Sequence, residues 1–145
     1  GLPWTVQRTT QFHDLVFALA YAVSRLPVVP VPRGVRVQPI DVRDLAPRIA
    51  DLVEAGPAGR APDLGGPEVH DLAEVVRMVQ RAVGTVRPLL RLPLAGRAYR
   101  AFRSGLHLVP DHRTGHRTFA EYVAEHVHRA GTGATRVDVP YRWRS

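Results

Sequence analysis

Cysteine and lysine, two residue types that carry much of the side-chain chemistry of enzymes, are both missing from this chain of 145 residues. The absence of cysteine excludes disulfide bonds and thiolate metal sites, and it is typical of a cytoplasmic protein, the location that we expect. Because all twenty basic residues are arginine, the chain also lacks a Walker phosphate loop, which needs a lysine after its glycines. A G-x-G-x-x-G dinucleotide fingerprint is absent as well.

Long hydrophobic runs are absent too. No stretch of about 18 consecutive apolar residues occurs, so the sequence predicts no transmembrane helix and we expect no membrane partner. The first residues do not combine a basic segment with an apolar one, and we therefore expect no secretory signal peptide.

What the chain does have is positive charge, with a formal net charge of +7. A basic balance of this size indicates an anionic partner such as nucleic acid. However, no block of five like charges occurs, and aromatic residues do not alternate with the arginines as in a base-stacking surface. Nucleic acid is therefore not the partner that we expect. A basic module that binds nucleic acid or a protein is kept as an alternative hypothesis.

The stretch that organises the chain lies at its start. Residues 4–6 are strand formers, and the polar residues 8–11 follow them directly and lead into an apolar helix. In open α/β sheets, ligands bind at the carboxyl ends of the strands. The sequence therefore predicts the first candidate site in this loop.

Apolar residues at helical spacing predict five helices. They cover residues 14–26, 41–55, 71–83, 95–103 and 119–129. The first is apolar nearly all round, which indicates burial on two sides. In the second, the expected core stripe is Leu45, Ile49, Leu52 and Val53, and Pro47 lies either in the first turn or where it distorts the next one.

Helix ends and connections also have sequence signals. We expect N-caps at Asp41 and Asp71, a capping box from Thr118 to Glu121, and a C-terminal Gly84. Four prolines between residues 27 and 39 predict a rigid connector and then a short edge strand over residues 35–40. Short strands are also expected near residues 60–64 and 88–93.

Four stretches resemble, in order, the atypical NmrA-like members of the short-chain dehydrogenase/reductase superfamily, which bind NAD(P). They are residues 2–14, 37–46, 63–68 and 115–122. The resemblance implies an α/β fold, namely the C-terminal portion of a Rossmann-like doubly wound sheet with a small helical lobe and without the glycine-rich nucleotide-binding half. It implies last strands and helices of the sheet in 1–70, a mostly helical substrate-side lobe in 71–130, and a flexible basic tail in 131–145.

The same resemblance implies a site. The cofactor, NAD or NADP, would be flanked by the loop after the first strand, whose residues are Arg8, Thr9, Thr10, Gln11 and Phe12. Arg36 and Gln38 would lie beside the substrate cleft. The alternative is structural: the loop is simply the polar start of a helix with a core phenylalanine, and Arg36 is solvated.

The chain departs from the family in two ways. With no lysine, it cannot contain the Tyr-x-x-x-Lys pair of a short-chain reductase, so no catalytic residue is predicted here. The glycine-rich turn that binds the pyrophosphate of the cofactor is also missing. The pair Gly65–Gly66 does not form that motif, and we predict an ordinary turn there. By the resemblance, both features would precede Gly1, in a missing N-terminal half.

The resulting hypothesis is a fragment or truncated member of an NAD(P)-dependent oxidoreductase-like family, whose complete relatives act on a small carbonyl or alcohol substrate. The alternatives are a non-catalytic NAD(P)-sensing or protein-binding NmrA-like module and the basic module above. The missing half or a second subunit is expected against the helix over 14–26.

Two other chemistries are not supported. The seven histidines include pairs at 112/116 and 126/128, but no nearby ligand pattern completes a metal site. The three serines lack the G-x-S-x-G elbow of a hydrolase.

Overall fold

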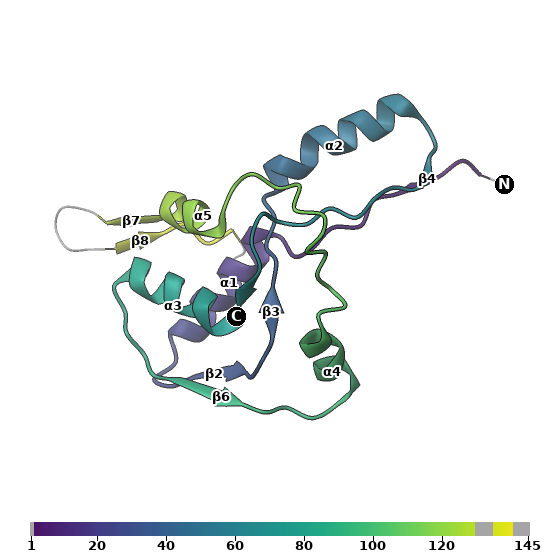
Figure 1. Cartoon of the computed structure of the whole chain (residues 1–145). Coiled ribbons are helices and arrows are strands. Elements are labelled where there is room, and N and C mark those ends of the chain that lie inside the picture. Colours follow the sequence, from purple (N-terminus) through teal and green to yellow (C-terminus); the bar gives the residue numbers. More distant parts are fainter. Residues whose placement is uncertain (1, 130–134, 141–145) are drawn as a thin grey trace.

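A computed structural model of the chain describes residues 2–129 and 135–140 (Figure 1). In chain order its elements are β1 Thr5–Val6, α1 His13–Ser24, β2 Val29–Pro32, β3 Arg36–Val37, α2 Val42–Ala55, β4 Gly59–Arg60, β5 His70–Asp71, α3 Leu72–Val83, β6 Leu89–Leu92, α4 Arg97–Ser104, α5 Phe119–His126, β7 Val127–Arg129 and β8 Thr135–Val137.

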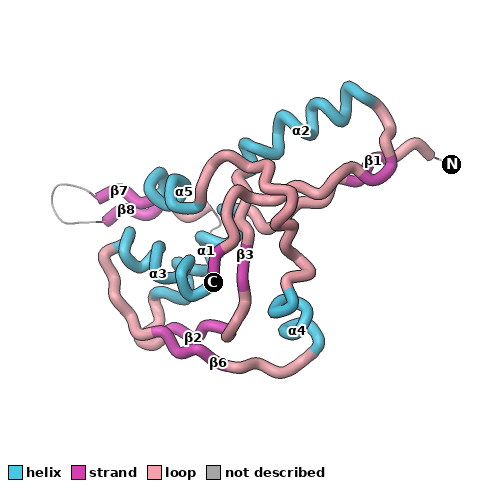
Figure 2. Tube along the Cα trace, in the orientation of Figure 1, coloured by secondary structure: helices cyan, strands magenta, loops and turns pink. Residues whose placement is uncertain are grey.

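The strands form four two-stranded pieces and not one continuous sheet (Figure 2). The pairs β1–β4 and β2–β6 are parallel, whereas β3–β5 and β7–β8 are antiparallel. A parallel bridge from Thr9 to Leu64 continues the first pair toward the centre, and a second from Phe12 to Ile40 joins the same loop to the residues after β3. The predicted mixed α/β class with parallel strands is therefore confirmed.

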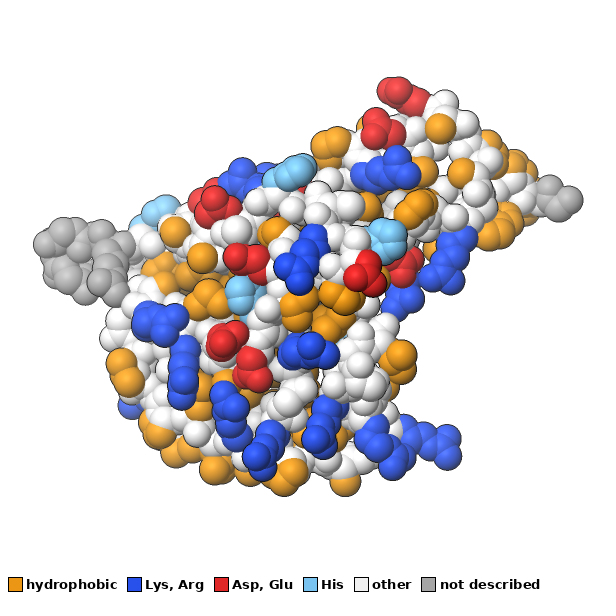
Figure 3. Space-filling view, viewed as in Figure 1, with side chains coloured by type: hydrophobic (Ala, Val, Ile, Leu, Met, Phe, Trp, Pro, Cys, Tyr) orange, Lys and Arg blue, Asp and Glu red, His pale blue; other side chains and the backbone are white. Residues whose placement is uncertain are grey.

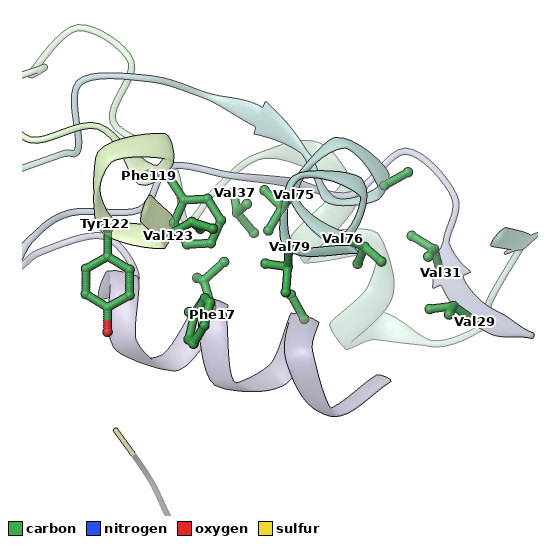
Figure 4. Close-up of a cluster of buried hydrophobic side chains, with 13 residues drawn as sticks. Phe17, Val29, Val31, Val37, Val75, Val76, Val79, Phe119, Tyr122 and Val123 are labelled. Atoms are coloured by element: carbon green, nitrogen blue, oxygen red, sulfur yellow. The ribbon is translucent and has the colours of Figure 1, made fainter. Parts of the chain in front are cut away.

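The core lies between α1, α3 and α5 (Figure 4). Its largest members are the fully buried rings of Phe17 and Phe119, which pack with Val75, Val76 and Val79 of α3. These are residues that the helical spacing places on one face of α3. The prediction that α1 is buried on two sides is only partly right, because Leu19 remains 52% exposed.

The predicted helix caps are confirmed. The Asp41 carboxylate accepts a hydrogen bond from the backbone N–H of Arg43 at 2.8 Å. Complete capping boxes begin α3 at Asp71 and α5 at Thr118, and α3 ends at Gly84 with a φ of 73°. Local side-chain chemistry thus sets these boundaries, which is why they are readable from sequence.

The expected proline connector is in fact a strand. In β2, Val29 and Val31 are buried, while Pro30 is exposed. The N–H groups of Val29 and Arg33 donate to β6 and its flank, at 2.9 Å each. Because N–H groups along a strand alternate in direction, the prolines occupy the positions whose missing N–H would face away from β6.

Helix α2 differs most from expectation. None of its residues is buried, so the stripe expected as core is not core, and Ile49 and Val53 are 40% and 75% exposed. Pro47 lies inside the helix, beyond its first turn. Figure 1 shows α2, β1 and β4 extending together as an arm away from the main body.

The last predicted helix ends earlier than expected. After His126 the chain continues as β7, which pairs with β8. Strand β8 lies inside the segment that the sequence predicts to be a flexible tail. Residues 131–134 and 141–145 of that segment lie outside the described residues.

Candidate functional site

The loop that follows β1 crosses two other segments at the centre of the molecule. Thr10 is buried; its N–H donates to the Leu64 carbonyl at 3.0 Å, and its hydroxyl accepts from the N–H of Gly66 at 3.3 Å. Gln11 accepts through its carbonyl from the N–H of Ile40 at 2.8 Å. The loop is therefore held by backbone bonds on both sides.

Gln38 ties this crossing to a third segment. Its side chain is fully buried, and the amide nitrogen donates to the carbonyls of Gly66 at 2.9 Å and Val109 at 3.2 Å. The amide oxygen accepts from the Val109 N–H at 2.8 Å, and the Gln38 N–H reaches the side chain of Gln11 at 3.3 Å. Gln38 thus connects its own segment to the segments of Gln11, Gly66 and Val109, and its side-chain amide is fully engaged by protein groups.

The glycine pair makes the crossing possible, and it is not the turn predicted from sequence. A Cβ at Gly66 would lie 1.7 Å from the Pro39 carbonyl oxygen. A Cβ at Gly65 would lie 2.4 Å from the Gln38 amide nitrogen. Gly65 also bridges Arg113 in parallel. The two glycines are required for close approach of backbones, not for a left-handed φ.

The remaining predicted site residues lie around this crossing. Arg8 pairs with Asp63 at 3.4 Å and donates to the Leu106 carbonyl at 3.0 Å. Arg36 is exposed, and its carbonyl accepts from the His107 ring at 2.7 Å. Thr9 bridges Leu64 and so continues the pairing of β1 with β4, whereas Phe12 bridges Ile40, after β3. The structure therefore gathers Arg8 to Phe12 and Gln38, while Arg36 points to solvent.

Beside the crossing lies a buried polar pair that sequence reasoning missed. His13 is fully buried, and its Nε2 lies 3.1 Å from the Pro39 carbonyl, which can only accept. The neutral ring therefore carries its proton on Nε2. Its Nδ1 lies 3.8 Å from Asp41 and has no hydrogen-bond partner among the described residues. Desolvation lowers the pKa of His13, partly opposed by Asp41.

Arginines hold the Asp41 carboxylate in its ionised form. Burial would raise the pKa of Asp41, but hydrogen bonds from Arg43, as short as 2.6 Å, outweigh it and lower that pKa. Arg117 approaches the same carboxylate at 3.3 Å, and both arginines also pair with Glu125 of α5. This network links the starts of α1 and α2 to α5. Only the cap at Asp41 was visible in sequence, because His13, Arg117 and Glu125 come from distant segments.

The accessible groups of the site are polar. The hydroxyl of Thr9, the amide of Gln11 and the guanidinium of Arg8 are partly exposed, and these groups can bind the amide or phosphate of a ligand. A shallow hollow beside them is lined by Trp4, Val6, Gln7, Arg8 and Arg60. Within residues 2–129 and 135–140, no group of acidic or histidine side chains could hold a metal ion.

Comparison with known proteins shows the fold. No protein-family model and no curated protein matches the chain. A nucleoside-diphosphate-sugar epimerase of Staphylococcus aureus matches with a TM-score of 0.58 at 16% identity, over 85% of this chain and 52% of that one. RMD of Pseudomonas aeruginosa, solved with NADPH, matches with a TM-score of 0.52 at 9% identity, over 82% and 44%. The chain thus has the fold of about half of such Rossmann-type structures, and spans about half their length.

Proposed function

We propose that this chain is the second half of an NAD(P)-dependent oxidoreductase of the atypical short-chain dehydrogenase/reductase type, related to the NmrA-like proteins. In the complete unit, hydride would pass between a nicotinamide and a small carbonyl or alcohol substrate. The observation that carries the proposal is the β1–β4 ribbon, which has the form of the last two strands of a larger parallel sheet.

One edge of that ribbon is unpaired in the described residues. The pairing with β4 uses Trp4 and Val6, whose carbonyls accept from Gly59 and Ala61 at 3.0 Å each. Since backbone groups alternate in direction along a strand, those of Thr5 and Gln7 face the other edge, which we call the β1 edge. The sheet contains no further strand there. A parallel strand would satisfy these groups.

One face of the ribbon is also open, because the side chains of Trp4 and Val6 lie on the same side of the strand. Trp4 and Val6 are 58% and 53% exposed. Trp4 also lines a hollow whose other side is formed by α2, where Ile49 and Val53 remain exposed. Parallel sheets are normally covered on both faces by helices. A missing half-domain is therefore the partner that fits, whether it comes from the same polypeptide or from a second subunit.

In this assignment the loop from Arg8 to Phe12 approaches the cofactor, NAD or NADP. Arg8 and Gln11 offer donors for phosphate or amide groups, and Thr10 and Gln38 hold the loop in place. Arg36 lies on the substrate side. Absence of lysine from the whole chain means that any proton-donating pair of the usual kind comes from the other half.

That same absence favours a second candidate, a non-catalytic NAD(P)-sensing module. The two candidates share the cofactor and differ in turnover. A complete protein that binds NADPH tightly and never oxidises it in the presence of carbonyl substrates would be a sensor.

The first test is the mass of the native protein in its source cells, by immunoblot against this chain. We expect either a band clearly heavier than 16.0 kDa or a 16.0 kDa chain that co-purifies with a nucleotide-binding subunit. In that native species, Gln11→Ala should weaken NADPH binding about fivefold, the effect of one lost hydrogen bond. The matched control is Gln7→Ala, four residues earlier, whose side-chain amide donates to the Pro62 carbonyl at 2.7 Å. A 16.0 kDa chain that is alone and binds no nucleotide would overturn the proposal.

A further inference from the structure

Two segments of the chain contain arginine as their only formally charged residue. Residues 25–40 and 75–110 carry ten arginines and no aspartate or glutamate: Arg25, Arg33, Arg36, Arg77, Arg81, Arg87, Arg91, Arg97, Arg100 and Arg103. The rest of the chain holds the other ten arginines together with all thirteen acidic residues. The net charge of +7 is therefore the sum of a strongly basic part and a mildly acidic remainder.

The fold brings the two segments together into one body, which we call the arginine lobe. Strand β2 of the first segment pairs with β6 of the second. The hydroxyl of Tyr99 on α4 donates to the Arg33 carbonyl at 2.5 Å, and the Arg103 side chain packs over Gly34. All ten arginines are exposed, and Figure 3 shows the arginines gathered over the lower part of the molecule, where β2, β6 and α4 lie.

Large apolar side chains stand among these arginines. The arginine lobe exposes Leu26, Val28, Val86, Leu90, Leu94, Phe102 and Leu106. Val86 is 90% and Leu106 73% exposed. In α4 the arginines recur at positions 97, 100 and 103, along one side of the helix, and Phe102 is 48% exposed on another side. The surface thus combines a net positive charge, reduced locally where Asp71 pairs with Arg91 at 3.8 Å, with side chains that gain by leaving water.

We propose that the arginine lobe binds the surface of an anionic lipid bilayer. Arginine guanidinium groups pair with lipid phosphates, and apolar side chains beside them insert at the boundary between headgroups and acyl chains. No helix in the described part of the chain could cross a membrane, so the binding is peripheral. It differs from our expectation of no membrane partner, which rested on the absence of a span.

A nucleic acid would use the same charge but not the apolar groups. Phosphate backbones neutralise arginines, whereas aliphatic side chains such as Leu94 and Leu106 gain nothing from a polyphosphate surface. Single strands bind on arrays of aromatic rings, and the arginine lobe exposes only Phe102 as a large aromatic side chain among the described residues. Lipid accounts for both features.

This inference does not depend on the proposed function, with which the arginine lobe shares only Arg36, a residue that none of the variants below changes. The β1 edge and α2, where the other half would dock, belong to the acidic remainder. The native protein could therefore bind vesicles and fail to bind NADPH, or the reverse.

The test is flotation of the native protein with vesicles of phosphatidylcholine, with and without phosphatidylglycerol. We expect binding only to the anionic vesicles and its loss on addition of salt. Each arginine at an anionic surface is worth on the order of 1 kcal/mol, so replacing three should lower the partition coefficient about 100-fold. The test variant is Arg97→Gln, Arg100→Gln and Arg103→Gln. The matched control, which removes the same charge outside the arginine lobe, is Arg60→Gln, Arg113→Gln and Arg136→Gln.

A second variant separates lipid from nucleic acid. Leu94→Ser with Leu106→Ser keeps every charge, and we expect it to weaken vesicle binding while leaving any binding to duplex DNA unchanged. Binding to neutral vesicles, equal losses in the two arginine triples, or vesicle binding indifferent to the leucine variant would each overturn the proposal. Circular dichroism identifies any variant that has unfolded, and in that case the other variant decides.

Discussion

At the residue scale, the tightest constraint is at Gly66. A methyl group there would lie 1.7 Å from the Pro39 carbonyl oxygen, so two backbones would have to separate. We expect Gly66→Ala to lower the free energy of unfolding by about 3 kcal/mol or more, measured by urea denaturation. The control is Gly84→Ala, in open space with a φ of 73°, which should cost only about 1 kcal/mol. Equal losses in both variants would show that the close approach is absent.

His13 provides a second residue-scale prediction, on pH. Because desolvation lowers its pKa in the folded protein, the unfolded chain takes up the proton first as the pH falls. Stability is therefore full above the ordinary histidine pKa of about 6.5 and declines as the pH falls below it toward the folded value. His13→Asn should remove this decline below about pH 6.5, although it lowers stability at neutral pH.

The measurement is the urea midpoint of both proteins across that pH range. Asp41 has a lowered pKa and also loses stability as the pH falls, but it starts only near its ordinary, much lower value. A decline of equal slope in the His13→Asn variant would assign the effect to other groups.

At the element scale, local chemistry decides where helices begin. The Thr118 hydroxyl accepts from the N–H of Glu121, whose carboxylate accepts in return from the N–H of Thr118 at 2.7 Å. Removing that hydroxyl in Thr118→Ala should cost about 1 kcal/mol of unfolding free energy, whereas Thr118→Ser keeps the cap and should cost little. Thermal unfolding of the three proteins tests this, and a serine variant as unstable as the alanine variant would contradict it.

Tertiary contacts decide which helix faces are buried. The stripes of α2 and α3 look alike in sequence, with apolar residues at helical spacing in both. In α3 the stripe meets Phe17 and Phe119 and is buried, but in α2 the corresponding Ile49 and Val53 remain exposed. Periodicity therefore predicts which residues share a face and cannot predict whether another element covers it.

At the scale of the whole molecule, the open β1 edge and the exposed apolar groups beside it make the isolated chain prone to associate. We expect its sedimentation coefficient to rise with concentration in the micromolar range. A lysine at an edge strand opposes strand addition, so Val6→Lys should restore a monomer.

A matched variant tests the alternative surface on α1. Leu19 is exposed to nearly the same degree as Val6, 52% against 53%. If association runs through α1, Leu19→Lys and not Val6→Lys will abolish it. A chain that stays monomeric without either substitution would count against a missing half-domain.

The sequence by itself determined the local features of this protein: the strand at residues 5–6, the caps at Asp41, Asp71 and Thr118, and the mixed α/β class. These depend on neighbours within a few positions along the chain. Only the tertiary structure decided that Gly65 and Gly66 allow a backbone crossing, that His13 lies beside Asp41, that Pro30 sits within a strand, and that ten arginines share one lobe. Each of these depends on which distant segments meet, and neither propensity nor spacing encodes that pairing.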